Sequence, residues 1–104
     1  MANQQTLLTP LEIEEQLTEL PKWDYQNTEL TRTFQFANFI ESIAFVEQLV
    51  LPAEELGHHP DIDIRYNQVT IRLTTHDIGG IGPLDLSLAK TINEIYGEQA
   101  NTTD

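Results

Sequence analysis

Two stretches of alternating residues, each broken by a short polar turn, constrain the fold of this chain most strongly. The first runs from Lys22 to Phe36 around Asn27-Thr28, and the second from Asp61 to Thr74 around Asn67-Gln68. Alternation places every second side chain on the same face of a strand. Both stretches therefore predict antiparallel hairpins. The mainly apolar faces contain Leu30, Arg32, Phe34 and Phe36 in the first stretch, and Ile62, Ile64, Tyr66, Val69, Ile71 and Leu73 in the second.

A short helix is predicted before the first hairpin. Thr9 can cap this helix, Pro10 suits its first turn, and Glu12 completes a capping box. Pro21 ends the helical pattern, because proline cannot continue a helix. The apolar positions of this segment are Leu11, Ile13, Leu17 and Leu20.

A longer helix is predicted between the two hairpins, where Asn38 and Glu41 form a second capping box. Gly57 is a natural place for this helix to end. Pro52 lies deep within the segment, so we expect the helix either to kink near Val50 or to restart with Pro52 in its first turn. Apolar residues recur at helical spacing at Phe39, Ile40, Ile43, Ala44, Val46 and Val50.

A glycine-rich loop and a last helix are predicted after the second hairpin. Pro83 suits the first turn of this helix and Gly97 its end, with an apolar stripe at Leu84, Leu88, Ile92 and Ile95. The order α-β-β-α-β-β-α predicts an α+β fold, with a four-stranded antiparallel sheet and three helices packed on one face. We expect one domain over residues 1–104, with polar tails at about 1–7 and 98–104.

Composition and charge exclude several classes of protein. A chain of 104 residues suits one domain, and 5 basic against 17 acidic residues give a net charge of −12, which disfavours binding to nucleic acid. No apolar run approaches the ~20 residues that cross a bilayer, and the first residues lack the pattern of a signal peptide. There is no cysteine for a disulfide or a thiolate site. We therefore expect a cytoplasmic protein that contacts neither nucleic acid nor membrane.

All three histidines lie within one stretch of the chain, and carboxylates flank them. His58 and His59 follow the predicted end of the central helix, while His76 follows the last strand on its polar side. Histidine has an unperturbed pKa of about 6.5 and so exchanges protons near neutrality. Together with Glu54 and Asp85, the histidines predict a functional cluster rather than separately solvated side chains.

The spacing within this stretch resembles the signature of the pterin-4a-carbinolamine dehydratases. The resemblance rests on a series of fixed gaps, which is more specific than a lone His-His-Pro motif. Trp23 and Phe34-Gln35-Phe36 also resemble the family, so the resemblance covers about residues 8–97. The residues that carry it in the central stretch are Glu54-Glu55-Leu56-Gly57-His58-His59-Pro60, Tyr66, Thr74-Thr75-His76 and Asp85.

Members of this family remove water from a 4a-hydroxytetrahydropterin and form the quinonoid dihydropterin, in tetrahydropterin recycling. The resemblance therefore implies a hydro-lyase whose substrate is the pterin and which needs no cofactor. The hydroxyl must be protonated and the N5 proton lost, which calls for a general acid and a general base. The resemblance implies that His58, His59 and His76 are catalytic. His59 and His76 would contact the reacting edge more directly, and His58 would assist or act as the base.

The resemblance also implies a set of substrate contacts that includes the histidines. Three nearby positions depart from a well-known form of the family: Gly57 replaces an aspartate, Ile62 an aromatic residue, and Leu84 an arginine. These departures leave the histidine set intact. The implied contacts are Glu54, Gly57, His58, His59, Thr74, Thr75, His76 and Asp85.

Simpler structural roles are open for several of these residues. Asp85 falls in the first turn of the last helix, where a carboxylate caps free amides, whether or not it also contacts a ligand or a histidine. Glu54, next to Glu55, equally suits a solvated surface position. Arg65 and Arg72 suit solvent-facing positions on the sheet. Aromatic residues at strand or helix periodicity suit the core rather than a stacking platform, and these are Trp23, Phe34, Phe36 and Phe39.

Two other functions remain as alternatives. Histidines and a carboxylate could bind zinc or iron, but adjacent His58 and His59 do not form an i, i+4 pair and no His-Glu-x-x-His motif is present. We therefore expect no metal. The second alternative is a non-catalytic binding partner, or an assembly or transcription cofactor of the same fold, because some family members have such roles. The resemblance and an open sheet edge imply a homodimer or homotetramer.

Overall fold

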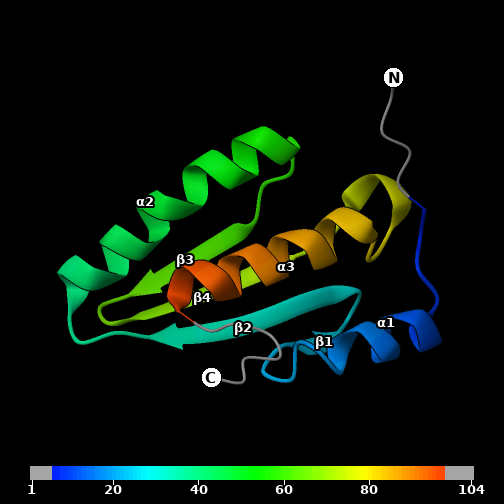
Figure 1. Cartoon of the computed structure of the whole chain (residues 1–104), viewed down its shortest axis with the longest axis horizontal. Coiled ribbons are helices and arrows are strands. Elements are labelled where there is room, and N and C mark those ends of the chain that lie inside the picture. Colours follow the sequence, from blue (N-terminus) through cyan, green and yellow to red (C-terminus); the bar gives the residue numbers. More distant parts are fainter. Residues whose placement is uncertain (1–5, 98–104) are drawn as a thin grey trace.

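A four-stranded antiparallel sheet forms the base of the fold, and the computed structural model describes it within residues 6–97. The strands are β1 (Asp24–Gln26), β2 (Glu29–Gln35), β3 (Asp61–Arg65) and β4 (Gln68–Leu73). Their spatial order is β1-β2-β4-β3, so the two predicted hairpins meet where β2 pairs with β4. This pairing leaves β1 and β3 at the edges of the sheet (Figure 1).

Three helices complete the core, namely α1 (Pro10–Leu17), α2 (Phe39–Leu56) and α3 (Pro83–Tyr96), and a 3-10 turn, η1 (His76–Ile78), lies between β4 and α3. In Figure 1, α2 and α3 lie over the sheet and α1 lies near β1. All three helices bury side chains against one face of the sheet, which confirms the predicted α+β architecture. The core includes Ile13, Phe45, Leu49, Leu88 and Ile92 from the helices, and Leu30, Phe34, Val69, Ile71 and Leu73 from the strands.

The two hairpin turns differ in how well the sequence predicted them. The first lies at Asn27-Thr28 as expected, and both residues have positive φ angles of 53° and 64°, as a type I′ turn requires. The second lies at Tyr66-Asn67 rather than Asn67-Gln68, because Gln68 pairs with Arg65 inside the ladder. Asn67 also binds the end of β2, since its side-chain amide donates to the carbonyl oxygen of Phe36 at 3.1 Å. Contact with the neighbouring strand therefore shifts the turn by one residue.

Helix α2 runs without interruption through Pro52, so it does not restart there. Asn38 caps its first turn by accepting a hydrogen bond from the amide of Glu41 at 2.9 Å, and Gly57 ends it with a φ of 64°. Proline removes one backbone hydrogen bond from the helix. Burial of Leu49 and Ala53 on either side of Pro52 keeps the two halves of the helix on the same core.

The buried face of α2 is not the apolar stripe that its sequence emphasised. The sheet-facing residues are Ser42, Phe45, Leu49 and Ala53. Phe39, which we expected in the core, is 50% exposed, and Ile40 and Val50 are 77% and 58% exposed. The helix is apolar on two sides, so periodicity alone does not identify the side that meets the sheet. Trp23 and Phe34 are buried as expected, and Phe36 packs against the core.

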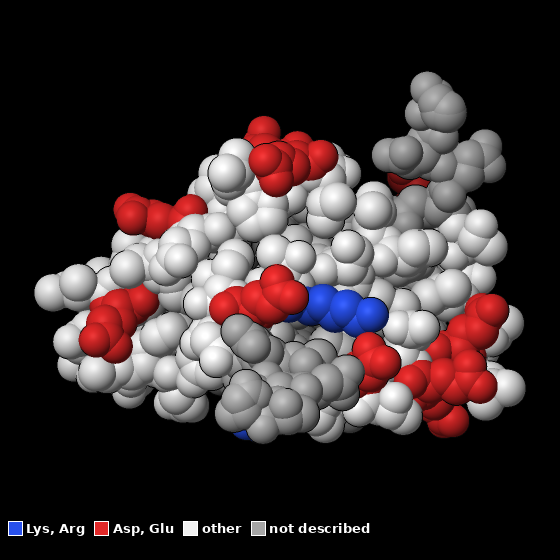
Figure 2. Space-filling model, viewed as in Figure 1, with Lys and Arg blue, Asp and Glu red and all other residues white. Residues whose placement is uncertain are grey.

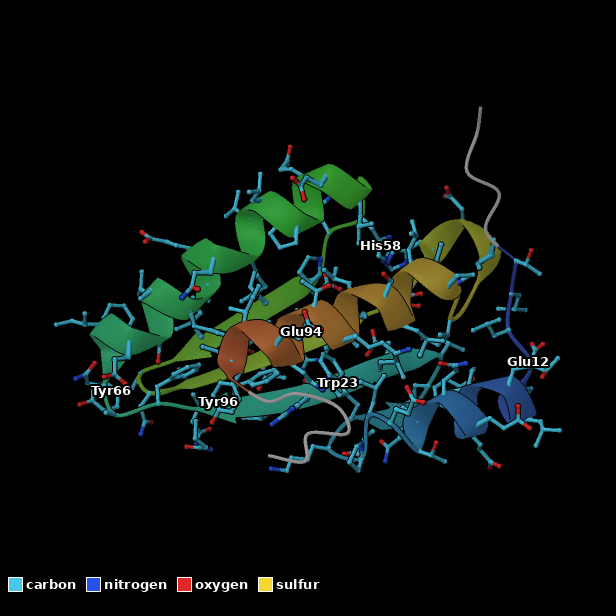
Figure 3. The ribbon with its side chains drawn as sticks, viewed as in Figure 1. Glu12, Trp23, His58, Tyr66, Glu94 and Tyr96 are labelled. Carbon is cyan, nitrogen blue, oxygen red and sulfur yellow. The ribbon has the colours of Figure 1, made fainter. Side chains whose placement is uncertain are left out.

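A buried polar network lies between the sheet and α3. Arg32 is only 6% exposed, and its guanidinium stacks over the ring of Phe34 at 4.3 Å. The side-chain oxygen of Asn93 accepts hydrogen bonds from Arg32 Nη1 at 2.7 Å and from Trp23 Nε1 at 2.9 Å. Figure 3 shows Trp23 beside α3 and Tyr96 at the end of this helix. These partners explain why a cation is tolerated on the apolar face of β2.

The charged residues of the chain are mainly acidic, and Figure 2 shows carboxylates scattered over one face. Arg65 lies on the sheet surface as expected, and its hydrogen bond to Asp63 at 3.1 Å raises the pKa of its guanidinium. The predicted polar tails lie largely outside the described residues, which exclude 1–5 and 98–104. No helix within residues 6–97 is long and apolar enough to cross a membrane.

Candidate active site

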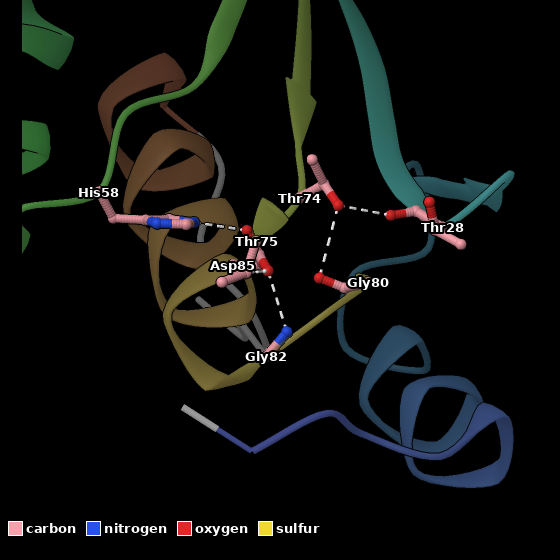
Figure 4. Close-up of polar contacts among 7 residues, drawn as sticks. All are labelled: Thr28, His58, Thr74, Thr75, Gly80, Gly82 and Asp85. Carbon is pink, nitrogen blue, oxygen red and sulfur yellow. Dashed lines mark hydrogen bonds and ion pairs between the residues drawn. The ribbon is translucent and has the colours of Figure 1, made fainter. Parts of the chain in front are cut away.

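Three chain segments meet at one end of the sheet (Figure 4). Asp61 at the start of β3 opposes Arg72 near the end of β4, so the loop after α2 lies beside the loop after β4. The second loop folds back before α3 because Thr75 pairs with Gly80 in an isolated β-bridge. The segments carry His58 and His59, Thr75 and His76, and Asp85, respectively.

A fully buried carboxylate, Asp85, lies at the centre of this region, with 0% of its surface exposed. Its Oδ1 lies 2.6 Å from Nε2 of His58. Its Oδ2 accepts hydrogen bonds from the hydroxyl of Thr75 at 2.7 Å and from the amide of Gly82 at 2.9 Å (Figure 4). Asp85 therefore both caps α3 and contacts a histidine, the two roles that its sequence position suggested. Because Asp85 is fully buried, it contacts His58 from the interior of the protein and is not exposed at the surface of the site.

The ring of His58 is held between α2 and α3, with 11% of its side chain exposed (Figure 3). A carboxylate only accepts hydrogen bonds, so a neutral His58 carries its proton on Nε2 and leaves Nδ1 as an acceptor. A hollow of about 300 Å³ lies beside the ring, at the lower end of the usual range for small-molecule sites. Its lining consists of Leu56, Gly57, His58, Thr75, Asp77, Ile78 and Leu84.

The adjacent histidine, His59, turns towards α2 instead. Its Nε2 lies 2.7 Å from Oε2 of Glu54, and their side chains are 61% and 66% exposed. This pair borders a second, more apolar hollow of about 230 Å³, which includes Val50 and Ile62. His58 and His59 therefore have different carboxylate partners, one buried and one in solvent.

His76 is exposed at the start of η1, as its position on the polar side of the strand predicted. The turn is held from both ends, since the amide of Thr75 donates to Gly80 O at 2.8 Å and the amide of Gly79 donates to Thr75 O at 3.1 Å. Gly79 has a φ of 75°, a conformation that glycine adopts without strain. Asp77, the next residue after His76, lines the hollow beside His58.

The two threonines expected to contact a substrate both have hydroxyls engaged within the protein. Thr74 Oγ1 donates to the carbonyl oxygen of Thr28 at 2.7 Å, which ties β4 to the first hairpin. Thr75 is 8% exposed and donates to Asp85. Gly57 remains at the edge of the hollow, where its backbone is accessible. Both hydroxyls thus hold the framework of the site.

Several residues of this region were not identified from sequence. Asp77 and Ile78 line the hollow, and the amide of Gly82 binds Asp85, yet no local motif marks them. The Thr75–Gly80 bridge and the hydrogen bond from Thr75 to Asp85 fold their loop against α3. Within residues 6–97, no three histidine, aspartate or glutamate side chains gather in a way that could hold a metal ion.

A family model, individual relatives and solved structures all match this chain, and they point to one family. The family model described as Pterin 4 alpha carbinolamine dehydratase matches residues 6–95. A relative from Chloroflexus aurantiacus that carries the same family name is 53% identical over 90 residues, which cover 86% of this chain and 97% of the relative. Another relative so named, from Thermosynechococcus vestitus, is 52% identical over 88 residues, covering 85% and 93%.

Solved structures agree with these sequence comparisons. A protein from Brucella melitensis, described as a transcriptional coactivator/pterin dehydratase, is 36% identical with a TM-score of 0.85, and the match covers 88% of this chain and 100% of that one. A pterin dehydratase-like protein identified as a RuBisCO assembly factor shares the fold, at 23% identity and a TM-score of 0.61 over 74% of this chain and 89% of that one. The family model and the close relatives extend over most of the chain, which therefore belongs to the pterin-4a-carbinolamine dehydratase family.

Proposed function

We propose that this protein dehydrates a 4a-hydroxytetrahydropterin to the quinonoid dihydropterin and water, as a hydro-lyase of tetrahydropterin recycling. The C4a–O bond breaks, the hydroxyl leaves as water after gaining a proton, and the N5 proton is lost, so the reaction involves no change of oxidation state. The observation that carries the proposal is the His58 ring, held by a buried carboxylate beside a hollow, in a chain of this family.

The histidines have distinct roles in this proposal. His58, with its proton fixed on Nε2 by Asp85, accepts the N5 proton at Nδ1 as the general base. His59 and His76 are exposed, and one of them delivers the single proton that the leaving hydroxyl takes up. Histidine suits both tasks, because it exchanges protons near neutral pH. General acid or base catalysis by one positioned side chain typically contributes about 10²–10⁴-fold to the rate.

Binding of the pterin ring relies mainly on groups around the hollow beside His58. The amino and amide N–H groups of a pterin are donors, and the Asp77 carboxylate and the backbone at Gly57 supply acceptors there. Leu56, Ile78 and Leu84 supply apolar contacts to the ring faces. Thr74 and Thr75 support these groups from within the protein.

A direct assay tests the proposed reaction. Chelator-treated protein is added to an enzymatically generated 4a-hydroxytetrahydropterin, and loss of the intermediate is followed by absorbance, with a His59→Ala/His76→Ala double variant alongside. We expect strong acceleration by the wild type and a loss of at least about 10²-fold in the variant. A folded wild-type protein without activity would favour a binding role instead. Activity that returned only with added metal would indicate a metal-dependent mechanism.

We further propose that the protein is a homo-oligomer that associates through the solvent-facing side of α2. Phe39, Val50 and Leu51 are 50%, 58% and 65% exposed on this helix. Ile40 is 77% exposed on the same helix, whereas Val46 packs against the chain's own core. The exposed apolar pairs Phe39–Ile40 and Val50–Leu51 therefore form the proposed contact with a second copy of the helix. With a charge of −12 per chain, association should strengthen as salt screens repulsion.

Sedimentation at low and high salt tests this second proposal. Wild-type protein should sediment as a dimer or tetramer, and Val50→Lys should sediment as a smaller species with unchanged circular dichroism. A wild-type protein that stays monomeric at all salt concentrations would contradict the proposed interface.

A further inference from the structure

Thr75 lies in the loop after β4 and contacts both the rest of that loop and the first turn of α3. Its backbone closes the turn that carries His76, because its amide donates to Gly80 O and its carbonyl accepts from Gly79 N at 3.1 Å. Its side chain reaches in the opposite direction and donates to Oδ2 of Asp85 at 2.7 Å. One residue therefore connects the segment of His76 to the carboxylate that binds His58.

The Thr75 hydroxyl restricts how the Asp85 carboxylate can turn. Oδ2 is held by Thr75 and by the amide of Gly82, and this leaves Oδ1 directed at Nε2 of His58. The two contacts to Oδ2 are buried, with Asp85 0% and Thr75 8% exposed, and the His58 side chain is only 11% exposed. Hydrogen bonds in such surroundings fix orientation strongly, because water does not compete for the partners.

We propose that Thr75 is a positioning residue, whose hydroxyl fixes the orientation of Asp85 and so the tautomer of His58, rather than a group that binds substrate. This inference rests on the proposed dehydratase function. Without the hydroxyl, Oδ2 accepts one hydrogen bond fewer and the Asp85 carboxylate can rotate. His58 is then a mixture of two tautomers, with the proton on Nε2 in only some of the molecules. At metal sites, groups that hydrogen-bond to a ligand histidine typically contribute about 10–100-fold to affinity or activity, and we expect an effect of the same size here.

The chain offers matched variants for a test. Thr75→Val removes the hydroxyl while keeping the shape of the side chain, and Thr75→Ser keeps the hydroxyl. Thr70→Val is the control, because the Thr70 hydroxyl also binds a side chain, Thr33 Oγ1 at 2.8 Å, but at a half-buried position of β4 outside the site. Thr75→Ala also lacks the hydroxyl and places no methyl group against Asp85, so it replaces the valine variant if that protein fails to fold.

The measurements are kcat and KM for the dehydratase reaction and the ¹⁵N NMR spectrum of labelled histidine. We expect Thr75→Val to lower kcat by about 10–100-fold with little change in KM, and to convert His58 from one tautomer to a mixture. Thr75→Ser should restore both properties, and Thr70→Val should change neither. A raised KM at unchanged kcat would show that Thr75 binds substrate and would overturn the proposal.

The NMR measurement separates this inference from the proposed function. If the wild-type protein has no dehydratase activity, the tautomer of His58 still reports whether Thr75 orients Asp85. A His58 tautomer that is the same in wild type, Thr75→Val and Thr75→Ala would overturn the inference, even in an active enzyme.

Discussion

Replacing Asp85 with asparagine exchanges one buried carboxylate oxygen for an amide NH₂ group. Oδ2 accepts two hydrogen bonds, from Thr75 and Gly82, so we expect the asparagine oxygen to take that position. The NH₂ group then faces Nε2 of His58 and can only donate to it. Nε2 must therefore become the acceptor, and the proton moves to Nδ1. The base proposed for the reaction is lost, although the shape of the site is preserved.

The size of the effect follows from the contacts that change. Hydrogen bonds to a charged group contribute about 1.5–3 kcal/mol and neutral ones about 0.5–1.5 kcal/mol. The hydrogen bonds from Thr75 and Gly82 become bonds to a neutral acceptor, and the bond with His58 reverses its direction. The variant should therefore lose about 1–3 kcal/mol of unfolding free energy. Typical domains have about 5–15 kcal/mol, so the protein stays folded. The wrong histidine tautomer should lower kcat by about 10²–10⁴-fold.

Urea unfolding, steady-state kinetics and ¹⁵N NMR of the histidines test this prediction together. Asp85→Asn should remain folded, show a His58 protonated on Nδ1, and lose activity. The matched Asp85→Ala variant removes the partner of three donors and should lose more stability, about 3–5 kcal/mol in total. Near-wild-type kcat in an Asp85→Asn protein with the switched tautomer would refute the assignment of His58 as the base.

Three further predictions concern single residues. Thr28→Gly should raise the unfolding free energy by about 0.5–1 kcal/mol, because the β-branched Thr28 is strained at its φ of 64° and glycine is not. A lower unfolding free energy, measured by urea denaturation, would contradict this. Phe45→Ala should lower the unfolding free energy by about 3–5 kcal/mol in the same assay, because Phe45 is 3% exposed and packs on Phe34 at a ring distance of 5.0 Å. Glu54→Gln should change stability by less than about 1 kcal/mol, because its pair with His59 is solvent-exposed. A larger loss would indicate that Glu54 is buried in the working protein.

Local features of the fold were predictable wherever neighbouring residues decide the backbone. The predicted capping box forms at Thr9 and Glu12, where each side chain binds the other residue's amide. Asn38 caps α2 as expected, but the reciprocal half of its box does not form, because Glu41 accepts a hydrogen bond from the amide of Ala37 instead. Gly57 ends α2 in the left-handed conformation, and Asn27-Thr28 forms the first turn. The histidine stretch was likewise recognisable from its spacing. In each case the information lies within a few residues, which is why sequence patterns convey it.

Contacts between distant segments were not predictable in this way. Only the packed structure decides that Phe45 rather than Phe39 faces the sheet, because both sides of α2 are apolar. The second turn moves to Tyr66-Asn67 because Gln68 is held inside β4, where it pairs with Gln35 of the neighbouring strand β2 as well as with Arg65 of β3.

The sequence by itself determined the order of helices and strands and the set of histidines, through local hydrogen bonding, backbone preference and residue spacing. The tertiary structure alone decided how those histidines differ. His58 meets Asp85 across 27 residues of sequence, while its neighbour His59 turns to Glu54. These different surroundings arise because Thr75 and Gly82 enclose Asp85 at the first turn of α3, whereas Glu54 lies on an exposed side of α2.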